Sequence, residues 1–183
     1  QSIINSALNH DLITWYDETS MMGKNITASG VEISLNNGIE FKSSLLVGAE
    51  GRTSSTREDA GIKSYHFPYH QKALVFSVYH EKPHQGVAWE AFHPNGPLAF
   101  LPIQDCLMTG RHRSGLVWTL PTAQADFWIT QENTVIATKL SELFGFLGKF
   151  EIVGEKWNYP LSAQMVDRFI GERSVIVGDA AHV

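Results

Sequence analysis

The stretch that decides the fold is Leu45-Leu46-Val47-Gly48-Ala49-Glu50-Gly51-Arg52-Thr53-Ser54-Ser55-Thr56-Arg57. An apolar strand runs into glycines, which permit tight turns and a close approach of the backbone to a ligand. A carboxylate, Glu50, follows at once, and Ser54 is placed to cap a short helix that runs to Gly61. This strand-to-helix turn fits a ligand-binding turn, whose helix N-terminus attracts an anion, and equally an ordinary turn with a solvated carboxylate.

A second stretch of the same kind reads Ser174-Val175-Ile176-Val177-Gly178-Asp179-Ala180-Ala181-His182. A short apolar strand again ends in a glycine and a carboxylate, Gly178 and Asp179, and small residues then begin a helix. A carboxylate at such a turn can accept hydrogen bonds from a sugar-like hydroxyl. The alternative is a helix-capping Asp, which is common in any α/β protein.

The chain between the two turns has a different composition. Residues 65–118 are rich in aromatic and β-branched side chains interrupted by prolines and glycines, which predicts a run of antiparallel strands. Residues 123–150 look helical, and residues 157–161 look extended. We therefore expect a mixed α/β (α+β) fold in three pieces. A partial α/β domain spans residues 1–64, an antiparallel sheet with a helix spans 65–159, and the chain returns to the α/β domain at 160–183.

The first 47 residues give weaker signals. Apolar residues at nearly helical spacing predict a helix over residues 3–15, and alternation predicts a strand over 26–35. Asn36-Asn37-Gly38 is a strong hairpin turn, after which a second strand is expected over residues 39–47.

Composition excludes several classes of protein. The 183 residues are 43% apolar and 18% charged, with a net charge of -5, as in a soluble globular protein. No basic cluster marks a nucleic-acid partner, and the apolar runs are far shorter than the ~20 residues of a membrane span. The single cysteine, Cys106, excludes an intrachain disulfide and fits a reducing compartment. We expect a cytoplasmic protein.

Two other chemistries are disfavoured by the residue pattern. His66 and His70, and also His80 and His84, have the spacing of metal ligands on a helix, but prolines inside both spans oppose a helix. We therefore expect no metal site. The sequence has neither a Gly-x-Ser-x-Gly nucleophile turn nor a Gly-Lys-Ser/Thr phosphate loop.

The order and spacing of the two turns resemble a known family. Gly48-Ala49-Glu50-Gly51-x-x-Ser54-x-x-Arg57 resembles the Asp-Gly motif of class A flavoprotein monooxygenases, and Gly178-Asp179-Ala180-Ala181-His182 resembles their Gly-Asp motif. The segments 79–90 and 96–102, and Val117-Trp118, look like the ubiquinone-biosynthesis hydroxylases of that family. The likeness covers nearly the whole chain.

The resemblance implies a p-hydroxybenzoate-hydroxylase-like fold, with a discontinuous FAD domain and an inserted substrate domain. FAD would be the cofactor and NAD(P)H the co-substrate. Asp179, with Gly178, would hold the ribityl chain of FAD. Three further residues would lie near the flavin pyrophosphate and the path of the nicotinamide: Glu50, Gly51 and Arg57.

Fewer residues are assigned to the substrate than to the cofactor. By the same resemblance, Leu101 and Pro102 would lie on a substrate-domain strand close to the flavin ring. Trp118 could line a pocket for a ring-bearing substrate, although such residues are more often the core of a sheet face. The sequence assigns no catalytic acid or base.

The activity implied is hydroxylation, with O2, of an aromatic ring in a polyprenylated phenol on the path to ubiquinone. Association with the inner face of a membrane or a ubiquinone-biosynthesis complex, and self-association, are further expectations. The alternatives are a related flavoprotein that hydroxylates or halogenates a small soluble aromatic, and a folded piece without catalysis that binds no FAD.

Two departures from the family pattern bear on these expectations. Glu50 stands where the family has Asp, and its carboxylate reaches about 1.3 Å further, enough to alter a positioned hydrogen bond. Residues 1–183 contain no Gly-x-Gly-x-x-Gly fingerprint of an ADP-binding βαβ unit. We interpret both ends of the chain as cuts and expect the 183 residues alone to be inactive.

Overall fold

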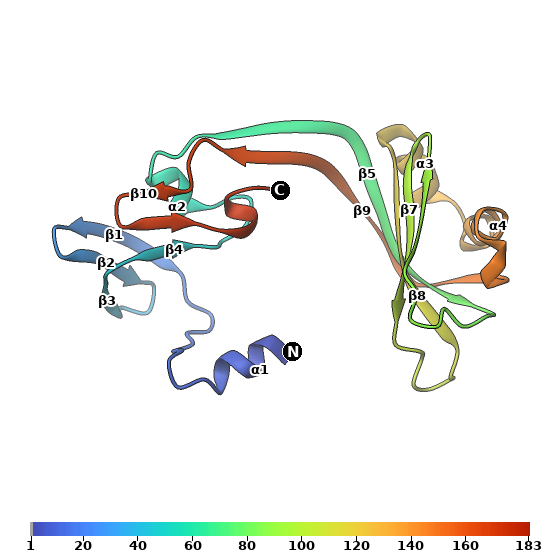
Figure 1. Ribbon diagram of the computed structural model, residues 1–183, viewed down its shortest axis with the longest axis horizontal. Helices are drawn as coiled ribbons and strands as arrows, with labels where there is room; N and C mark the ends of the chain where they lie inside the picture. Colours follow the sequence, from blue (N-terminus) through green and yellow to red (C-terminus); the bar gives the residue numbers. More distant parts are fainter. Residues whose placement is uncertain (1) are drawn as a thin grey trace. The chain divides into compact units, whose positions relative to one another are not determined.

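A computed structural model describes residues 2–183, which divide into two compact units (Figure 1). The first is formed by the chain up to Tyr65 together with Gln164–Val183, and the second is His66–Ala163. The chain thus changes unit within a few residues of positions 64 and 160, where the composition changes. The assignment of these units to cofactor and substrate stays a prediction.

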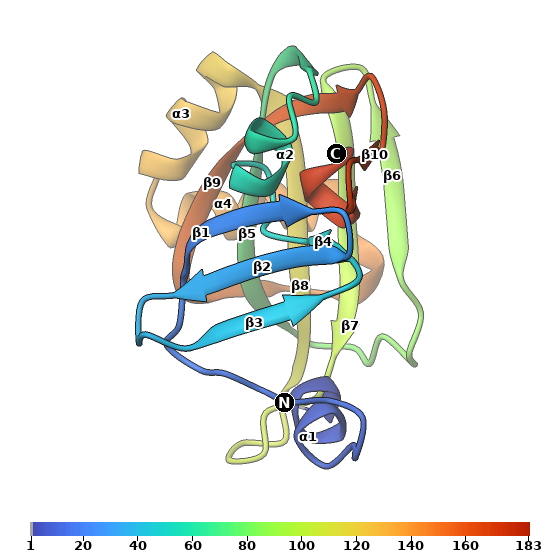
Figure 2. The same cartoon turned by 90° about the vertical axis from the view of Figure 1, so that its left-hand side faces the viewer.

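The first unit contains two small sheets. Its elements are α1 (Ser2–Leu8), β1 (Met21–Thr27), β2 (Gly30–Leu35), β3 (Glu40–Ser43), β4 (Leu46–Gly48), α2 (Ser55–Asp59), β10 (Ile170–Gly171), β11 (Ser174–Ile176) and the 3-10 turn η2 (Gly178–Ala180). Strands β1, β2 and β3 form an antiparallel sheet, seen side by side in Figure 2. The other sheet has the order β10-β11-β4, and β11 is parallel to β4.

Three of the expected boundaries in this unit are wrong. The helix ends at Leu8: the Asn9 N–H and side chain both donate to the Asn5 carbonyl, and the Leu12 N–H donates to His10 Nδ1 in place of a helical carbonyl. The strand expected over residues 26–35 is interrupted by a turn at residues 28–29 that separates β1 from β2. The strand expected over 39–47 is also divided, since β3 and β4 belong to different sheets.

Two local predictions are confirmed. The turn at Asn36-Asn37-Gly38 joins β2 to β3 as a hairpin, with Gly38 at φ 82°. Ser54 is the N-cap of α2, and its side-chain oxygen accepts a hydrogen bond from the Arg57 N–H at 3.1 Å. Both follow from local chemistry that needs no tertiary contact.

The second unit contains one antiparallel sheet with helices on one face. Its elements are β5 (Ser64–His80), which begins just before the unit, β6 (Trp89–His93), β7 (Gly96–Ile103), β8 (His112–Pro121), α3 (Thr122–Thr130), α4 (Asn133–Leu143), the 3-10 turn η1 (Gly145–Leu147) and β9 (Phe150–Val166). The strand order is β6-β7-β8-β5-β9. The predicted run of antiparallel strands over residues 65–118 is confirmed.

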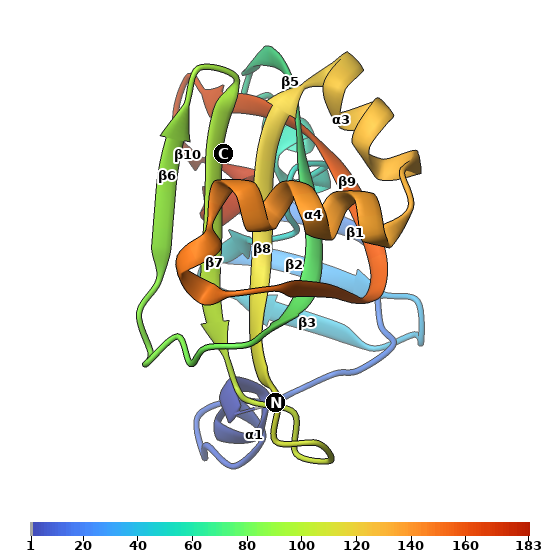
Figure 3. The same cartoon turned by 90° about the vertical axis from the view of Figure 1, so that its right-hand side faces the viewer.

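The core of this unit lies between the sheet and its helices. Alternate residues of the central strands are buried, including Leu74 on β5, Phe100 on β7 and Leu116 on β8. Ile136 and Leu140 of α4 are buried in the same cluster, and Figure 3 shows α4 crossing the face of the sheet. Because successive side chains of a strand point to opposite faces, the residues between these buried ones lie on the other face of the sheet, which no helix of the unit covers.

The expected helix over residues 123–150 is correct in type and wrong in continuity. Gln131 and Glu132 are extended and separate α3 from α4, and Phe150 already belongs to β9. The extended piece expected over 157–161 is part of this longer strand, β9. None of the helices described in residues 2–183 has the length and apolar character needed to cross a bilayer.

Candidate functional site

The two turns singled out in the sequence lie side by side in the first unit. Strands β4 and β11 are parallel, with Val47 opposite Val175 and Gly48 opposite Ile176. Beyond them, the Val177 N–H donates to the Gly48 carbonyl at 2.9 Å. Both turns therefore leave the same edge of the sheet, at the carboxyl ends of neighbouring parallel strands, where open α/β sheets bind their ligands.

Glu50 binds the start of α2 with both carboxylate oxygens. Its Oε2 accepts from Ser54 Oγ at 2.6 Å, and its Oε1 accepts from the Thr56 N–H at 2.9 Å. The hydroxyls of Ser55 and Thr56 also donate to Oε1. Glu50 thus fixes the loop internally and takes up an N–H group at the start of α2, which would otherwise be open to a ligand.

These contacts set the charge of Glu50. Burial by itself would raise the pKa of the carboxyl group, but the hydrogen bonds from Ser54 and Thr56 outweigh it and lower the pKa from the ordinary 4.5 to about 2. The ionised carboxylate is the form that accepts all of these bonds. Glu50 is therefore negative over the whole physiological range.

The Glu50→Gln substitution is expected to lower stability at neutral pH and to make little difference in acid. A carboxyl group with a depressed pKa in the folded state stabilises the protein above about pH 4.5, and this contribution fades as the pH falls toward 2. Urea denaturation of both proteins from neutral to acid pH measures the difference. A gap that stays constant with pH would contradict the assignment, and Glu58→Gln, at an exposed position of the same helix, is the control.

Gly48 is enclosed by both turns. A Cβ at this position would lie 2.9 Å from Glu50 Oε2 and Thr56 Cβ, and 3.0 Å from Ile176 Cδ1. The sequence therefore needs glycine here for close packing of β4 against α2 and β11.

The Gly48→Ala substitution is expected to destabilise the protein by about 1–3 kcal/mol, the usual range for an overpacked site. Chemical denaturation gives the free energy of unfolding. Gly145→Ala is the matched control, since in residues 2–183 no atom beyond its own neighbours in the chain lies within 4 Å of the corresponding Cβ position. Equal stabilities of the two variants would contradict the packing argument.

Arg57 joins the two turns. Its side chain is buried, with 4% of the residue exposed. Nη2 donates to the carbonyl of Arg52 at 2.8 Å, within the first turn, and Nη1 donates to the carbonyl of Ala180 at 3.0 Å, within the second. A single planar guanidinium thereby fixes the separation of two segments that are 123 residues apart.

Asp179 and the neighbouring glycines are open to a ligand. Asp179 is exposed, and its carboxylate forms no hydrogen bond or ion pair within residues 2–183. Gly178 and Gly51 have φ of 60° and 83°, and no atom of the described chain lies within 4 Å of either Cβ position. A left-handed backbone without a side chain lets a ligand approach closely.

A further residue, Gln164, reaches the same turn and was not identified from the sequence. It lies on β9, is 2% exposed, and donates from Nε2 to the carbonyl of Asp179 at 3.3 Å. The only sequence signal was a polar residue two positions before the apolar Val166, and such a residue is usually exposed.

The other predicted residues belong to the second unit. Leu101 is 43% exposed and lies on the face of the sheet without helices. Trp118 lies on the opposite face, 5% exposed, with its ring 5.2 Å from that of Trp128. Pro102 pairs with Ser114, a residue of the helix-covered face, and is partly buried. The three pocket candidates thus do not share one face of the sheet.

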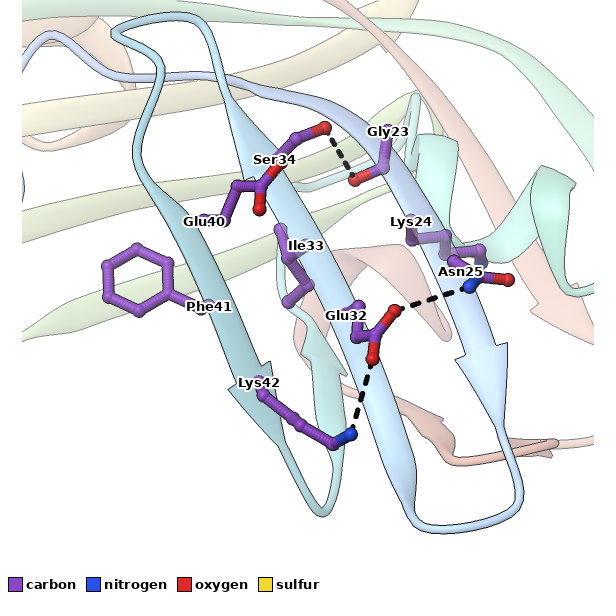
Figure 4. A pocket seen from close by; sticks show the side chains of 9 residues that line it. All are labelled: Gly23, Lys24, Asn25, Glu32, Ile33, Ser34, Glu40, Phe41 and Lys42. Atoms are coloured by element: carbon purple, nitrogen blue, oxygen red, sulfur yellow. Dashed lines mark hydrogen bonds and ion pairs between the residues drawn. The ribbon is translucent and has the colours of Figure 1, made fainter.

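A hollow on the first unit contains none of the predicted residues. It has a volume of about 480 Å³ and lies on the β1–β3 sheet (Figure 4). Three of its polar side chains bond to one another, with Glu32 accepting from Asn25 at 3.3 Å and from Lys42 at 3.2 Å, and Lys24 pairs with Asp59 at 3.7 Å. We therefore place the candidate site at the two turns, where the Asp179 carboxylate has no hydrogen bond or ion pair within residues 2–183. Among residues 2–183, no group of three or more His, Cys, Asp or Glu side chains is arranged for a metal ion.

Comparison with curated proteins finds ubiquinone hydroxylases among the relatives of this chain. The chain is 39% identical over 154 residues to the ubiquinone hydroxylase UbiL of Rhodospirillum rubrum, covering 84% of this chain and 34% of that protein. It is 32% identical over 151 residues to the ubiquinone hydroxylase UbiM of Neisseria meningitidis, covering 82% of this chain and 32% of that protein. The chain spans about a third of the length of these curated relatives.

Solved structures support the fold. The crystal structure of PqsL, a probable FAD-dependent monooxygenase from Pseudomonas aeruginosa, matches 99% of this chain and 51% of its own with a TM-score of 0.75 and 18% identity. The flavin-dependent halogenase CmlS matches 93% of this chain and 32% of its own with a TM-score of 0.67 and 16% identity. The expected mixed α/β, p-hydroxybenzoate-hydroxylase-like fold is confirmed. A family model described as FAD binding domain matches residues 15–183, and the chain therefore belongs to the FAD-binding domain family.

Proposed function

We propose that this chain contributes the ribityl-binding turn and the substrate sheet of an FAD-dependent monooxygenase that hydroxylates an aromatic ring. One observation carries the proposal: two motif turns far apart in sequence meet at one sheet edge, where the Asp179 carboxylate is exposed and has no partner within residues 2–183. Membership of the FAD-binding domain family and the similarity to ubiquinone hydroxylases support it.

The residues at this edge fit FAD. A carboxylate with free lone pairs can accept hydrogen bonds from the hydroxyls of a ribityl chain, and Asp179 has this character. Arg57 uses two of its five N–H donors and forms no ion pair in residues 2–183. A buried cation without a carboxylate partner favours a nearby anion, in this case the pyrophosphate.

The chain's own residues then have separate tasks. Asp179, with the open backbone of Gly178, binds and orients the ribityl chain. Gly51 gives the pyrophosphate side a backbone without a side chain, and Glu50 and Arg57 hold that loop in place. Bound FAD supplies the redox chemistry, in which NAD(P)H is oxidised, O2 is reduced, and one oxygen atom goes to the ring and the other to water.

We assign the unit formed by residues up to 65 and from 164 to the cofactor, and the unit 66–163 to the substrate. The face of the sheet without helices, which carries Leu101, is the surface proposed to meet the aromatic ring, while Pro102 lies next to Leu101 on the same strand but on the helix-covered face. Trp118 supports this surface from the core, where it packs on Trp128.

The substrate class proposed is a polyprenylated phenol on the path to ubiquinone. The names of the relatives support it. Such a substrate is dissolved in a membrane, so we propose that the protein works in the cytoplasm, at the inner face of the membrane. Its proposed partners there are other enzymes of the ubiquinone path or further copies of itself. Exposed apolar side chains such as Leu107 and Met108, at 86% and 94%, are candidates for this contact.

The test is an assay of the complete protein with FAD, NAD(P)H and O2. A polyprenylated phenol and a short-chain soluble analogue are offered separately, and mass spectrometry identifies the products. We expect the prenylated ring to gain one hydroxyl group. Turnover of the soluble ring alone, or a halogenated product when halide is added, would contradict the substrate class, and NAD(P)H-independent product would contradict the reaction.

A further inference from the structure

Gln164 is a buried polar residue in an apolar environment. It lies near the end of β9, and Val166, which follows on the same face of the strand, is buried with Ile176, Ala180 and Ala181 in the core of the first unit. An apolar residue would satisfy this pattern better, and a buried amide is retained at such a position only when it has hydrogen-bond partners. The partner of its NH2 group is the backbone carbonyl of Asp179.

The turn that carries Asp179 is held at three consecutive carbonyls. The Gly178 oxygen accepts from the N–H groups of Ala181 and His182 at 2.9 and 3.1 Å. The Asp179 oxygen accepts from Gln164, and the Ala180 oxygen accepts from Arg57. The backbone on both sides of the Asp179 side chain is therefore fixed, while the carboxylate itself stands exposed.

The backbone of Gln164 is held in place by hydrogen bonds. Its N–H donates to the Val183 carbonyl and its carbonyl accepts from the Val183 N–H, both at 2.9 Å. Met165 and His182 form the adjoining antiparallel bridge. The end of β9 thus runs alongside the residues that follow the turn, and this pairing delivers the Gln164 side chain to the Asp179 carbonyl.

We propose that Gln164 is a positioning residue for the cofactor: its amide fixes the peptide of Asp179, so that the carboxylate is held in advance in the orientation that receives the ribityl hydroxyls. This inference rests on the proposed function. Fixing a binding group before the ligand arrives reduces the conformational entropy lost on binding, so the effect of Gln164 appears in affinity for FAD.

The experiment measures FAD binding to the complete apoprotein by quenching of flavin fluorescence. Gln164→Leu keeps the size of the side chain and removes the donor. Loss of one such hydrogen bond is expected to raise the Kd for FAD about five- to tenfold. Gln131→Leu is the matched control, because Gln131 also donates to a backbone carbonyl, that of Phe127 at 3.1 Å, in the other unit.

A double-mutant cycle separates positioning from a general structural role. If Gln164 acts through the Asp179 carboxylate, Gln164→Leu has no further effect on the Kd in an Asp179→Ala background, with FAD titrated to millimolar concentrations. A penalty of equal size in both backgrounds would overturn the proposal, as would an unchanged Kd in Gln164→Leu alone.

The experiment also covers a Gln164 variant that does not fold and a failure of the proposed function itself. If Gln164→Leu does not fold, Gln164→Glu carries the same test, since it keeps the shape of the side chain and replaces the NH2 donor with an oxygen. FAD binding that depends on Asp179 but not on Gln164 overturns this inference alone. A wild-type protein that binds no FAD overturns the proposed function and this inference with it.

Discussion

Asp179→Ala is expected to weaken FAD binding by about a hundredfold or more. Hydrogen bonds to a charged group contribute about 1.5–3 kcal/mol each, and two such bonds from ribityl hydroxyls correspond to at least about two decades in Kd. The fold should lose little, because the carboxylate is exposed and has no hydrogen bond within residues 2–183. The variant therefore separates cofactor binding from folding.

Flavin fluorescence and the visible flavin absorbance of the purified protein measure this loss, and urea denaturation of the apoprotein measures stability. Glu172→Ala removes another exposed carboxylate of the same unit, close to β11, and should leave both unchanged. An Asp179→Ala protein that retains its flavin at wild-type affinity would place the ribityl chain elsewhere.

Arg57→Met should affect both the fold and the cofactor. Methionine fills much of the buried volume but leaves the carbonyls of Arg52 and Ala180 without their donor. Buried groups left unpaired in this way typically destabilise a protein by about 2–4 kcal/mol in total. Because the two turns lose their connection, FAD binding should fall together with stability.

The control for this prediction is Arg168→Met. Arg168 also donates to two backbone carbonyls, those of Ala60 and Gly61 at 3.1 Å, but its side chain is 51% exposed. Its loss should change the free energy of unfolding by less than about 1 kcal/mol, since water can replace it. Equal effects of the two substitutions in urea denaturation would contradict the role assigned to Arg57.

Sequence patterns predicted the features whose causes are local. The Asn-Asn-Gly hairpin, the Ser54 cap and the strand before Gly178 each depend on residues within a few positions of one another, and the structure has all three. The helix expected over residues 3–15 ends early, at Leu8, and the Leu12 N–H donates to the His10 side chain, a local bond that apolar spacing does not show.

Contacts between residues that are far apart in the sequence could not be predicted from local patterns. The parallel pairing of β4 with β11 joins segments separated by the whole second unit, and the bond from Arg57 to Ala180 depends on that pairing. The bond from Gln164 depends on the pairing of the end of β9 with residues 182–183. The resemblance to the flavoprotein monooxygenases indicated Arg57 as a site residue but did not predict its hydrogen bond to the Ala180 carbonyl. The hydrogen bonds of Glu50 reach residues only four to six positions away, but they depend on the closed conformation of the loop, which residue spacing does not show.

The most direct test of the central claim is oxygen transfer by the complete protein. It is incubated with FAD, NAD(P)H, a polyprenylated phenol and dioxygen labelled with heavy oxygen, and the product is analysed by mass spectrometry. The proposed function predicts one labelled oxygen atom in the new ring hydroxyl, and loss of that product in Asp179→Ala. A hydroxyl that carries oxygen from water, or product formation that persists at the wild-type rate in Asp179→Ala, would contradict it.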